Sequence, residues 1–90
     1  MSHTHQQKNA LTTRIRRIVG QLEGVERALA DEADCAEILR QLASVRGAMN
    51  GLMGEVMESH LREHVLAAPT DAERGIGAEE LIAVMKTYLK

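Results

Sequence analysis

The chain of 90 residues is 44% hydrophobic and 27% charged with Tyr88 as its one aromatic residue, which allows a single small domain packed by aliphatic side chains. A single cysteine, Cys35, excludes an internal disulfide. We expect a cytoplasmic protein, because no apolar run could span a membrane and no signal-peptide pattern opens the chain.

The formal net charge of −2 is unevenly distributed along the chain. Residues 1–22 carry four bases and no acid, whereas residues 23–90 carry seven bases and thirteen acids. A basic end on an otherwise acidic chain indicates a polyanionic partner for that end.

The first six residues are polar and lack periodicity, so we expect residues 1–6 to form a flexible arm. After them, apolar residues recur in alternating steps of four and three. This spacing predicts a helix over residues 7–30 with a heptad-like seam made by Leu11, Ile15, Ile18, Leu22, Val25 and Leu29.

A second, longer helix is predicted over residues 35–67, with Asp34 as a candidate cap of its first turn and Pro69 ending it. Its apolar stripe includes Ile38, Leu42, Val45, Met49, Leu52 and Val56. A rod of roughly 50 Å, at about 1.5 Å per residue, is longer than one small chain can cover. We therefore expect the protein to self-associate.

Residues 68–77 are rich in helix breakers and are predicted to form a loop. A third helix is predicted over residues 78–89, with an apolar face made by Leu81, Ile82, Met85 and Leu89. The expected fold class is all-α: a three-helix protomer with one long central helix, in a single domain over residues 1–90.

His60 and His64 lie four residues apart, so both imidazoles project from one face of a helix and form a usable clamp for a transition metal. A chance pair on a surface helix is the alternative. Because 25 residues separate Cys35 from His60, about 37 Å of straight helix keeps the thiol away from the pair within one chain. Two antiparallel copies would bring Cys35 of one chain beside the imidazoles of the other, giving a dimer with two shared sites.

The N-terminal arm offers further donors. Removal of Met1 before the small residue Ser2 would leave a free α-amine, which titrates near neutrality and can bind metal once deprotonated. His3 follows directly, so its imidazole could chelate together with the amine. An arm that orders only when an ion arrives would be a switch.

Four segments together resemble the CsoR/RcnR family of metal-sensing bacterial repressors: "RIRRIVGQLEGVERAL", the isolated Cys35, "RGAMNGLMGEVMESHLREH" and the terminal "YLK". The resemblance covers nearly the whole chain. It implies an all-helical dimer of dimers, a homotetramer, that binds operator DNA without its effector and releases the DNA when the effector binds.

The branches of that family differ at the positions of His3, Cys35, His60 and His64. The copper branch has cysteine in place of His64, and the formaldehyde branch usually has proline in place of Ser2 and an acidic residue in place of His64. The nickel/cobalt branch has both "MSHT" at its start and "EH" at positions 63–64, as this chain does.

The resemblance therefore implies a nickel(II)- or cobalt(II)-responsive repressor of efflux or resistance genes. Its expected metal ligands are the Ser2 amine, His3, Cys35, His60 and His64, with Glu63 as a further candidate. Zinc(II) is an alternative ion, which would need only a subset of these donors. Asp34 stands where that branch has a glutamate, and His5 is an additional candidate donor outside the family pattern.

By the same resemblance, one face of the first helix belongs to the operator-binding surface. Arg14, Arg17 and Gln21 share this face, and Arg16 and Lys8 add charge on the same helix. Such a face would neutralise phosphates, with Gln21 able to bond a base edge or the backbone. A solvated helix face is the alternative reading of these charges.

Two other functions stay open. A formaldehyde-responsive repressor of the same family would use Cys35 and the N-terminal amine, and a metal-binding helical protein would bind no DNA at all. An enzyme is not expected, because the sequence holds no nucleophile–base motif and no phosphate-binding loop.

Overall fold

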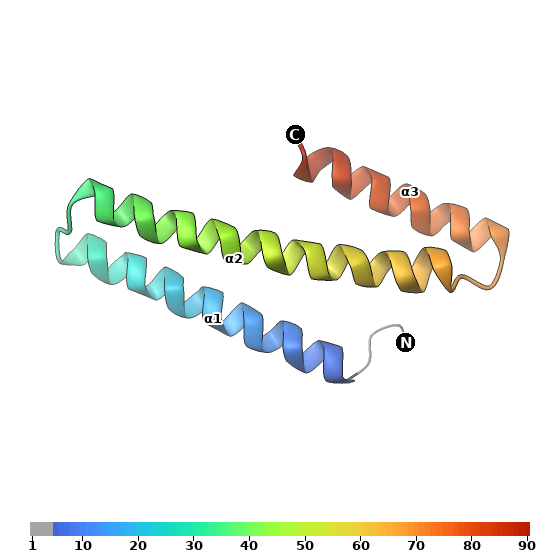
Figure 1. Cartoon of the computed structure of the whole chain (residues 1–90), viewed down its shortest axis with the longest axis horizontal. Coiled ribbons are helices and arrows are strands. Elements are labelled where there is room, and N and C mark those ends of the chain that lie inside the picture. Colours follow the sequence, from blue (N-terminus) through green and yellow to red (C-terminus); the bar gives the residue numbers. More distant parts are fainter. Residues whose placement is uncertain (1–4) are drawn as a thin grey trace. The chain divides into compact units, whose positions relative to one another are not determined.

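The computed structural model describes residues 5–90, and side chains from Gln7 onward. Three α-helices make up this part of the chain: α1 spans His5–Ala30, α2 spans Cys35–Leu61 and α3 spans Asp71–Tyr88. A π-helical turn, η1, continues α2 over Arg62–Leu66 (Figure 1). Residues 5–90 contain no strand, so the predicted all-α class with three helices is confirmed.

The described residues divide into two compact units, residues 5–53 and residues 54–90. In the first unit α1 packs antiparallel against the first part of α2, since Arg14 contacts Gly51 and Gln21 contacts Ser44. Its small core consists of Ile18, Val25 and Val45, with Ile38, Ala48 and Leu52 packed against it.

The turn between α1 and α2 is closed by backbone hydrogen bonds and a side-chain cap. Ala33 N–H donates to the Ala28 carbonyl at 2.9 Å across Glu32, which has a φ of 57° in the left-handed region. Asp34 Oδ1 accepts a hydrogen bond from the Glu37 N–H at 2.8 Å, so the predicted cap of α2 is confirmed. Hydrogen bonds from Arg40 and then Gln41 hold the pKa of Glu37 below its ordinary value.

Several predicted helix boundaries differ from those of the structure. The first helix begins at His5 and not at residue 7, so His5 and Gln6 do not belong to the expected arm. The helical path of α2 reaches residue 66, just before the predicted end at 67, but its last turn is π-helical. The predicted loop over residues 68–77 is the largest error, because α3 already begins at Asp71.

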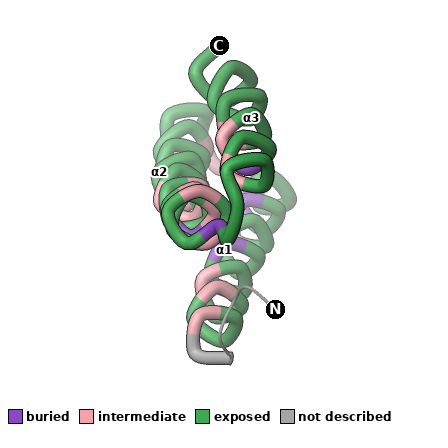
Figure 2. The backbone as a smooth tube through the Cα atoms, turned by 90° about the vertical axis from the view of Figure 1, so that its right-hand side faces the viewer, coloured by how far each residue is buried: buried purple, intermediate pink, exposed green. Residues whose placement is uncertain are grey.

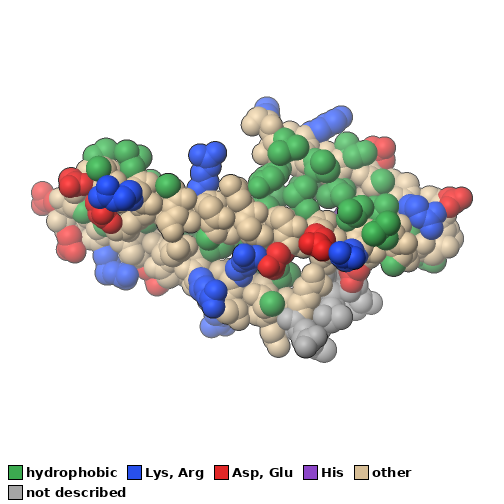
Figure 3. Space-filling view, viewed as in Figure 1, with side chains coloured by type: hydrophobic (Ala, Val, Ile, Leu, Met, Phe, Trp, Pro, Cys, Tyr) green, Lys and Arg blue, Asp and Glu red, His purple; other side chains and the backbone are tan. Residues whose placement is uncertain are grey.

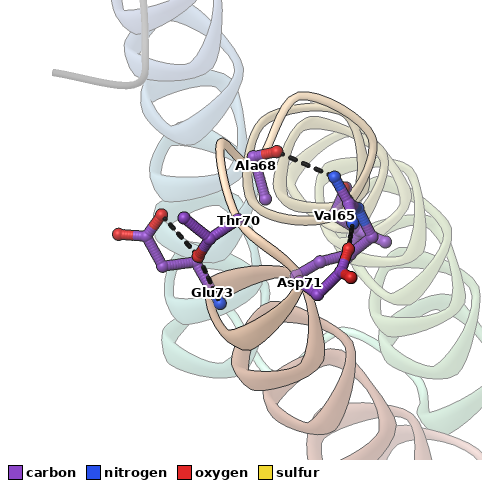
Figure 4. Close-up of polar contacts among 6 residues, drawn as sticks. Val65, Ala68, Thr70, Asp71 and Glu73 are labelled. Carbon is purple, nitrogen blue, oxygen red and sulfur yellow. Dashed lines mark hydrogen bonds and ion pairs between the residues drawn. The ribbon is translucent and has the colours of Figure 1, made fainter.

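The early start of α3 follows from the capping box Thr70-x-x-Glu73. Thr70 Oγ1 accepts a hydrogen bond from the Glu73 N–H at 3.1 Å, and the Thr70 hydroxyl lies 3.2 Å from Glu73 Oε2 (Figure 4). The cap satisfies a backbone donor that a helix start otherwise leaves without an intrahelical partner. It therefore outweighs Gly75 and Gly77, which lower helix propensity within α3.

Burial is sparse in both units. The buried hydrophobic residues are only Ile18, Val25, Ala28, Val45 and Ala68 among the described positions (Figure 2). In the second unit, apolar side chains gather over α3, where Ile76, Ile82, Val84, Met85, Tyr88 and Leu89 are exposed (Figure 3).

Candidate functional site

The structure places the two histidines of the predicted clamp side by side. His60 lies in the last turn of α2 and His64 inside η1, and their ring centroids are 4.8 Å apart. His60 is half-buried and His64 is exposed. Two adjacent imidazoles, one of them open to solvent, can supply two nitrogen ligands to one transition metal ion.

The His60 ring is held by α3. Its Nε2 lies 2.9 Å from the Gly77 carbonyl oxygen and 3.6 Å from Glu80 Oε1. A carbonyl oxygen can only accept, so Nε2 carries the hydrogen in this arrangement and the lone pair is on Nδ1. Nδ1 is therefore the nitrogen through which His60 can bind a metal without breaking its bond to α3.

A hollow beside His64 brings oxygen donors near the pair. Glu63, Glu73 and Glu80 line it together with His64, Ala68, Pro69, Ile76 and Gly77. Glu63, the further candidate ligand from the sequence, is half-buried there. Among the described side chains, those from Gln7 onward, no three His, Cys, Asp or Glu groups converge as a ready metal-binding group.

Apart from Glu63, the remaining predicted ligands belong to other parts of the chain. Cys35 is the first residue of α2, exposed and without a disulfide, and it belongs to the unit of residues 5–53. Ser2 and His3 lie outside the described residues, as does the side chain of His5. What the structure brings together is therefore His60 and His64.

The predicted DNA-binding residues of α1 have different surroundings. Arg14 is half-buried and its Nη1 donates to the Gly51 carbonyl at 3.3 Å, which ties α1 to α2. Arg17 and Gln21 line an open groove between these helices, and Gln21 Nε2 donates to Ser44 Oγ at 3.2 Å. Arg16 and Lys8 are exposed.

The same groove contains a basic residue that the sequence interpretation missed, Arg27. The sequence spacing could have revealed Arg27, because Arg17, Gly20, Gly24 and Arg27 follow one another in steps of three and four along one helix face. The Arg27 guanidinium lies against this face, with Nη2 3.6 Å from where a Cβ on Gly24 would stand. The basic surface of α1 therefore extends one to two turns further than predicted.

Comparisons with known proteins show the family to which this chain belongs. Residues 7–87 match the family described as metal-sensitive transcriptional repressors, and the chain belongs to this family. Its members regulate transcription and are not enzymes, as the sequence predicted. No helix within residues 5–90 combines the length and the apolar character that crossing a bilayer requires.

Two curated relatives align over their full length and the full length of this chain. One is an uncharacterized protein in the bioA 5′ region of Serratia marcescens, 48% identical over 91 residues. The other is the transcriptional repressor RcnR of Citrobacter koseri, 38% identical over 90 residues.

Two solved structures have closely similar folds. A glutamate-to-histidine variant of the formaldehyde-responsive regulator FrmR from Salmonella enterica serovar Typhimurium is 41% identical, with a TM-score of 0.89 over 96% of this chain and 98% of that one. The copper-sensing repressor CsoR with Cu(I) from Geobacillus thermodenitrificans is 26% identical, with a TM-score of 0.91 over 100% of this chain and 94% of that one.

Proposed function

We propose that this protein is a nickel(II)- or cobalt(II)-responsive repressor that binds operator DNA without metal and releases it when metal binds. The observation that carries the proposal is the adjacent imidazole pair of His60 and His64, with ring centroids 4.8 Å apart. Nitrogen donors at both positions suit nickel(II) and cobalt(II), which accept mixed nitrogen, oxygen and sulfur ligands. The genes controlled would serve metal efflux or resistance.

The shared site of the proposal requires a second copy of the chain. On α1, the buried residues Ile18 and Val25 are seven apart, and a second row at the same spacing, Ile15, Leu22 and Leu29, is exposed. On α2, Val45 is buried, whereas Leu42, Met49 and Val56 form an exposed row with the same period. An unfilled heptad row on each helix supports assembly into dimers and tetramers.

In such a dimer, Cys35 of one chain would join His60 and His64 of its neighbour. The arm would add the Ser2 amine and His3, with Glu63 as a further oxygen donor. Recruitment of the arm would couple metal binding to loss of DNA, because a segment ordered by the metal can bias which of two states the tetramer occupies.

The DNA would lie against the basic residues of α1. Arg16, Arg17 and Lys8 are exposed there, and Arg27 extends the charge along the same groove. Arg14 would contribute mainly by holding α1 on α2. Contacts to phosphate make this binding dependent on salt concentration.

The proposal is tested with the intergenic DNA beside the protein's own gene, labelled for fluorescence anisotropy. We expect the metal-free protein to bind it and nickel(II) or cobalt(II) to weaken binding about tenfold or more. A His64→Ala variant should bind the DNA equally and keep its affinity when metal is added. DNA binding that neither metal weakens, while zinc(II) or copper(I) does, would contradict the proposal.

A formaldehyde-responsive repressor is the second candidate. It is favoured by the 41% identity to a variant of the formaldehyde-responsive regulator FrmR and by the exposed Cys35 thiol. Formaldehyde would then add mass to the protein through Cys35 and release the DNA. In the same anisotropy experiment, formaldehyde in place of metal separates the two functions.

A further inference from the structure

At Gly77, α3 comes very close to the backbone of η1. The residue is buried, and a Cβ built on it would lie 2.0 Å from the His64 carbonyl oxygen, 2.7 Å from the His64 carbonyl carbon and 3.0 Å from His64 Cβ. The two shorter distances are to backbone atoms, which cannot yield by rotation of a side chain. Any residue other than glycine would therefore push α3 away from His64.

The same residue contacts the other imidazole. The Gly77 carbonyl oxygen lies 2.9 Å from His60 Nε2, so one glycine touches the backbone of His64 and the ring of His60. The hydrogen bond exists only because α3 comes this close. The identity of residue 77 thus controls the surroundings of both histidines.

Arg74, one turn earlier on the same face of α3, holds the helix in this position. Its Nε donates to the Val65 carbonyl at 3.2 Å and its Nη2 to the Ala68 carbonyl at 3.0 Å. Val65 lies near the C-terminal end of η1, and Ala68 directly follows its C-cap residue, Ala67. Arg74 therefore anchors α3 to the segment that carries His64, and Gly77 sets the distance between them.

We propose that Gly77 is a positioning residue of the metal site. By allowing contact with the His64 backbone, it keeps its own carbonyl on His60 Nε2 and so holds the His60 ring with Nδ1 available to a metal. The inference rests on the proposed function only in taking His60 and His64 as ligands. A larger residue would break the His60 bond and leave the ring free to rotate away.

The test compares Gly77→Ala with Gly75→Ala in the full-length protein. Gly75 lies in the same helix and is exposed, and an added Cβ there would meet no atom within 4 Å beyond its chain neighbours and the backbone of its own helix, so it is a matched control. We expect Gly77→Ala to bind cobalt(II) about 10-fold more weakly or worse and to shift the visible absorption bands of the bound ion. Gly75→Ala should keep the natural affinity and spectrum.

Unchanged cobalt(II) affinity and absorption bands in Gly77→Ala would overturn the inference. If that variant does not fold, nitrogen-15 NMR of the natural metal-free protein decides: a proton on Nε2 of His60 supports the inference, and a proton on Nδ1 overturns it. If the natural protein binds no cobalt(II) through these histidines, the proposed function fails. The NMR measurement would still report whether Gly77 holds His60.

Discussion

Asp34 combines two possible roles at a single residue, because it caps α2 and directly precedes the candidate ligand Cys35. Its Oδ1 accepts the Glu37 N–H at 2.8 Å. The sequence left open whether this carboxylate also binds metal. The hydrogen bond accounts for an aspartate at this position without any metal, since Asp and Asn are both strong N-cap residues.

Asp34→Ala should lower the free energy of unfolding by about 1 kcal/mol, because the Glu37 N–H loses its partner, whereas Asp34→Asn should nearly retain it. Urea denaturation measures both values. If Asp34 is only a cap, Asp34→Asn also leaves cobalt(II) affinity unchanged. Full stability combined with a large loss of cobalt(II) affinity in Asp34→Asn would instead make Asp34 a ligand.

At the scale of the element, α3 shows what sequence patterns can and cannot predict. Gly75 and Gly77 suggested a loop, but the capping box at Thr70 and Glu73 begins the helix at Asp71. The box was visible in the sequence and could have corrected the boundary. That a glycine stands inside this helix at position 77 could not be predicted, because the glycine is required by a tertiary contact with His64.

Thr70→Ala should lower the free energy of unfolding by about 1 kcal/mol, because the Glu73 N–H at the start of α3 loses its acceptor. Thr13→Ala is the control. Thr13 lies inside α1, where its hydroxyl bonds the Asn9 carbonyl and alanine has the higher helix propensity. Thermal unfolding followed by circular dichroism compares the two, and equal losses would contradict the role of the cap.

The π-helical turn at the end of α2 is a second feature that no local sequence pattern predicted. Periodicity predicted a continuous helix to residue 67, and the helical path does reach Leu66. The change in winding begins at Arg62 and places His64 inside the wider turn. Such turns occur frequently at functional sites, and this one carries half of the imidazole pair.

At the scale of the whole molecule, the fold class, the three helices and the spacing of His60 and His64 followed from the sequence, because periodicity and i, i+4 geometry are local properties. The partners of Arg14 and Gly77 did not follow, since each depends on a residue of another element. The thin core and the exposed heptad rows of α1 and α2 indicate that the chain packs against other copies of itself. They support the self-association that a metal site shared between two copies requires.

The central claim is that Cys35 of one chain and the imidazole pair of its neighbour bind the same ion, and a mixing experiment tests it most directly. Cys35→Ala and His64→Ala chains are unfolded together, refolded and titrated with cobalt(II), and thiolate-to-cobalt absorbance is recorded. Neither variant alone should show the band. The mixture should show about a quarter of the natural intensity, because random pairing makes half the dimers mixed and each mixed dimer has one intact site of two. A mixture that shows no thiolate-to-cobalt band, like each variant alone, would contradict the shared site.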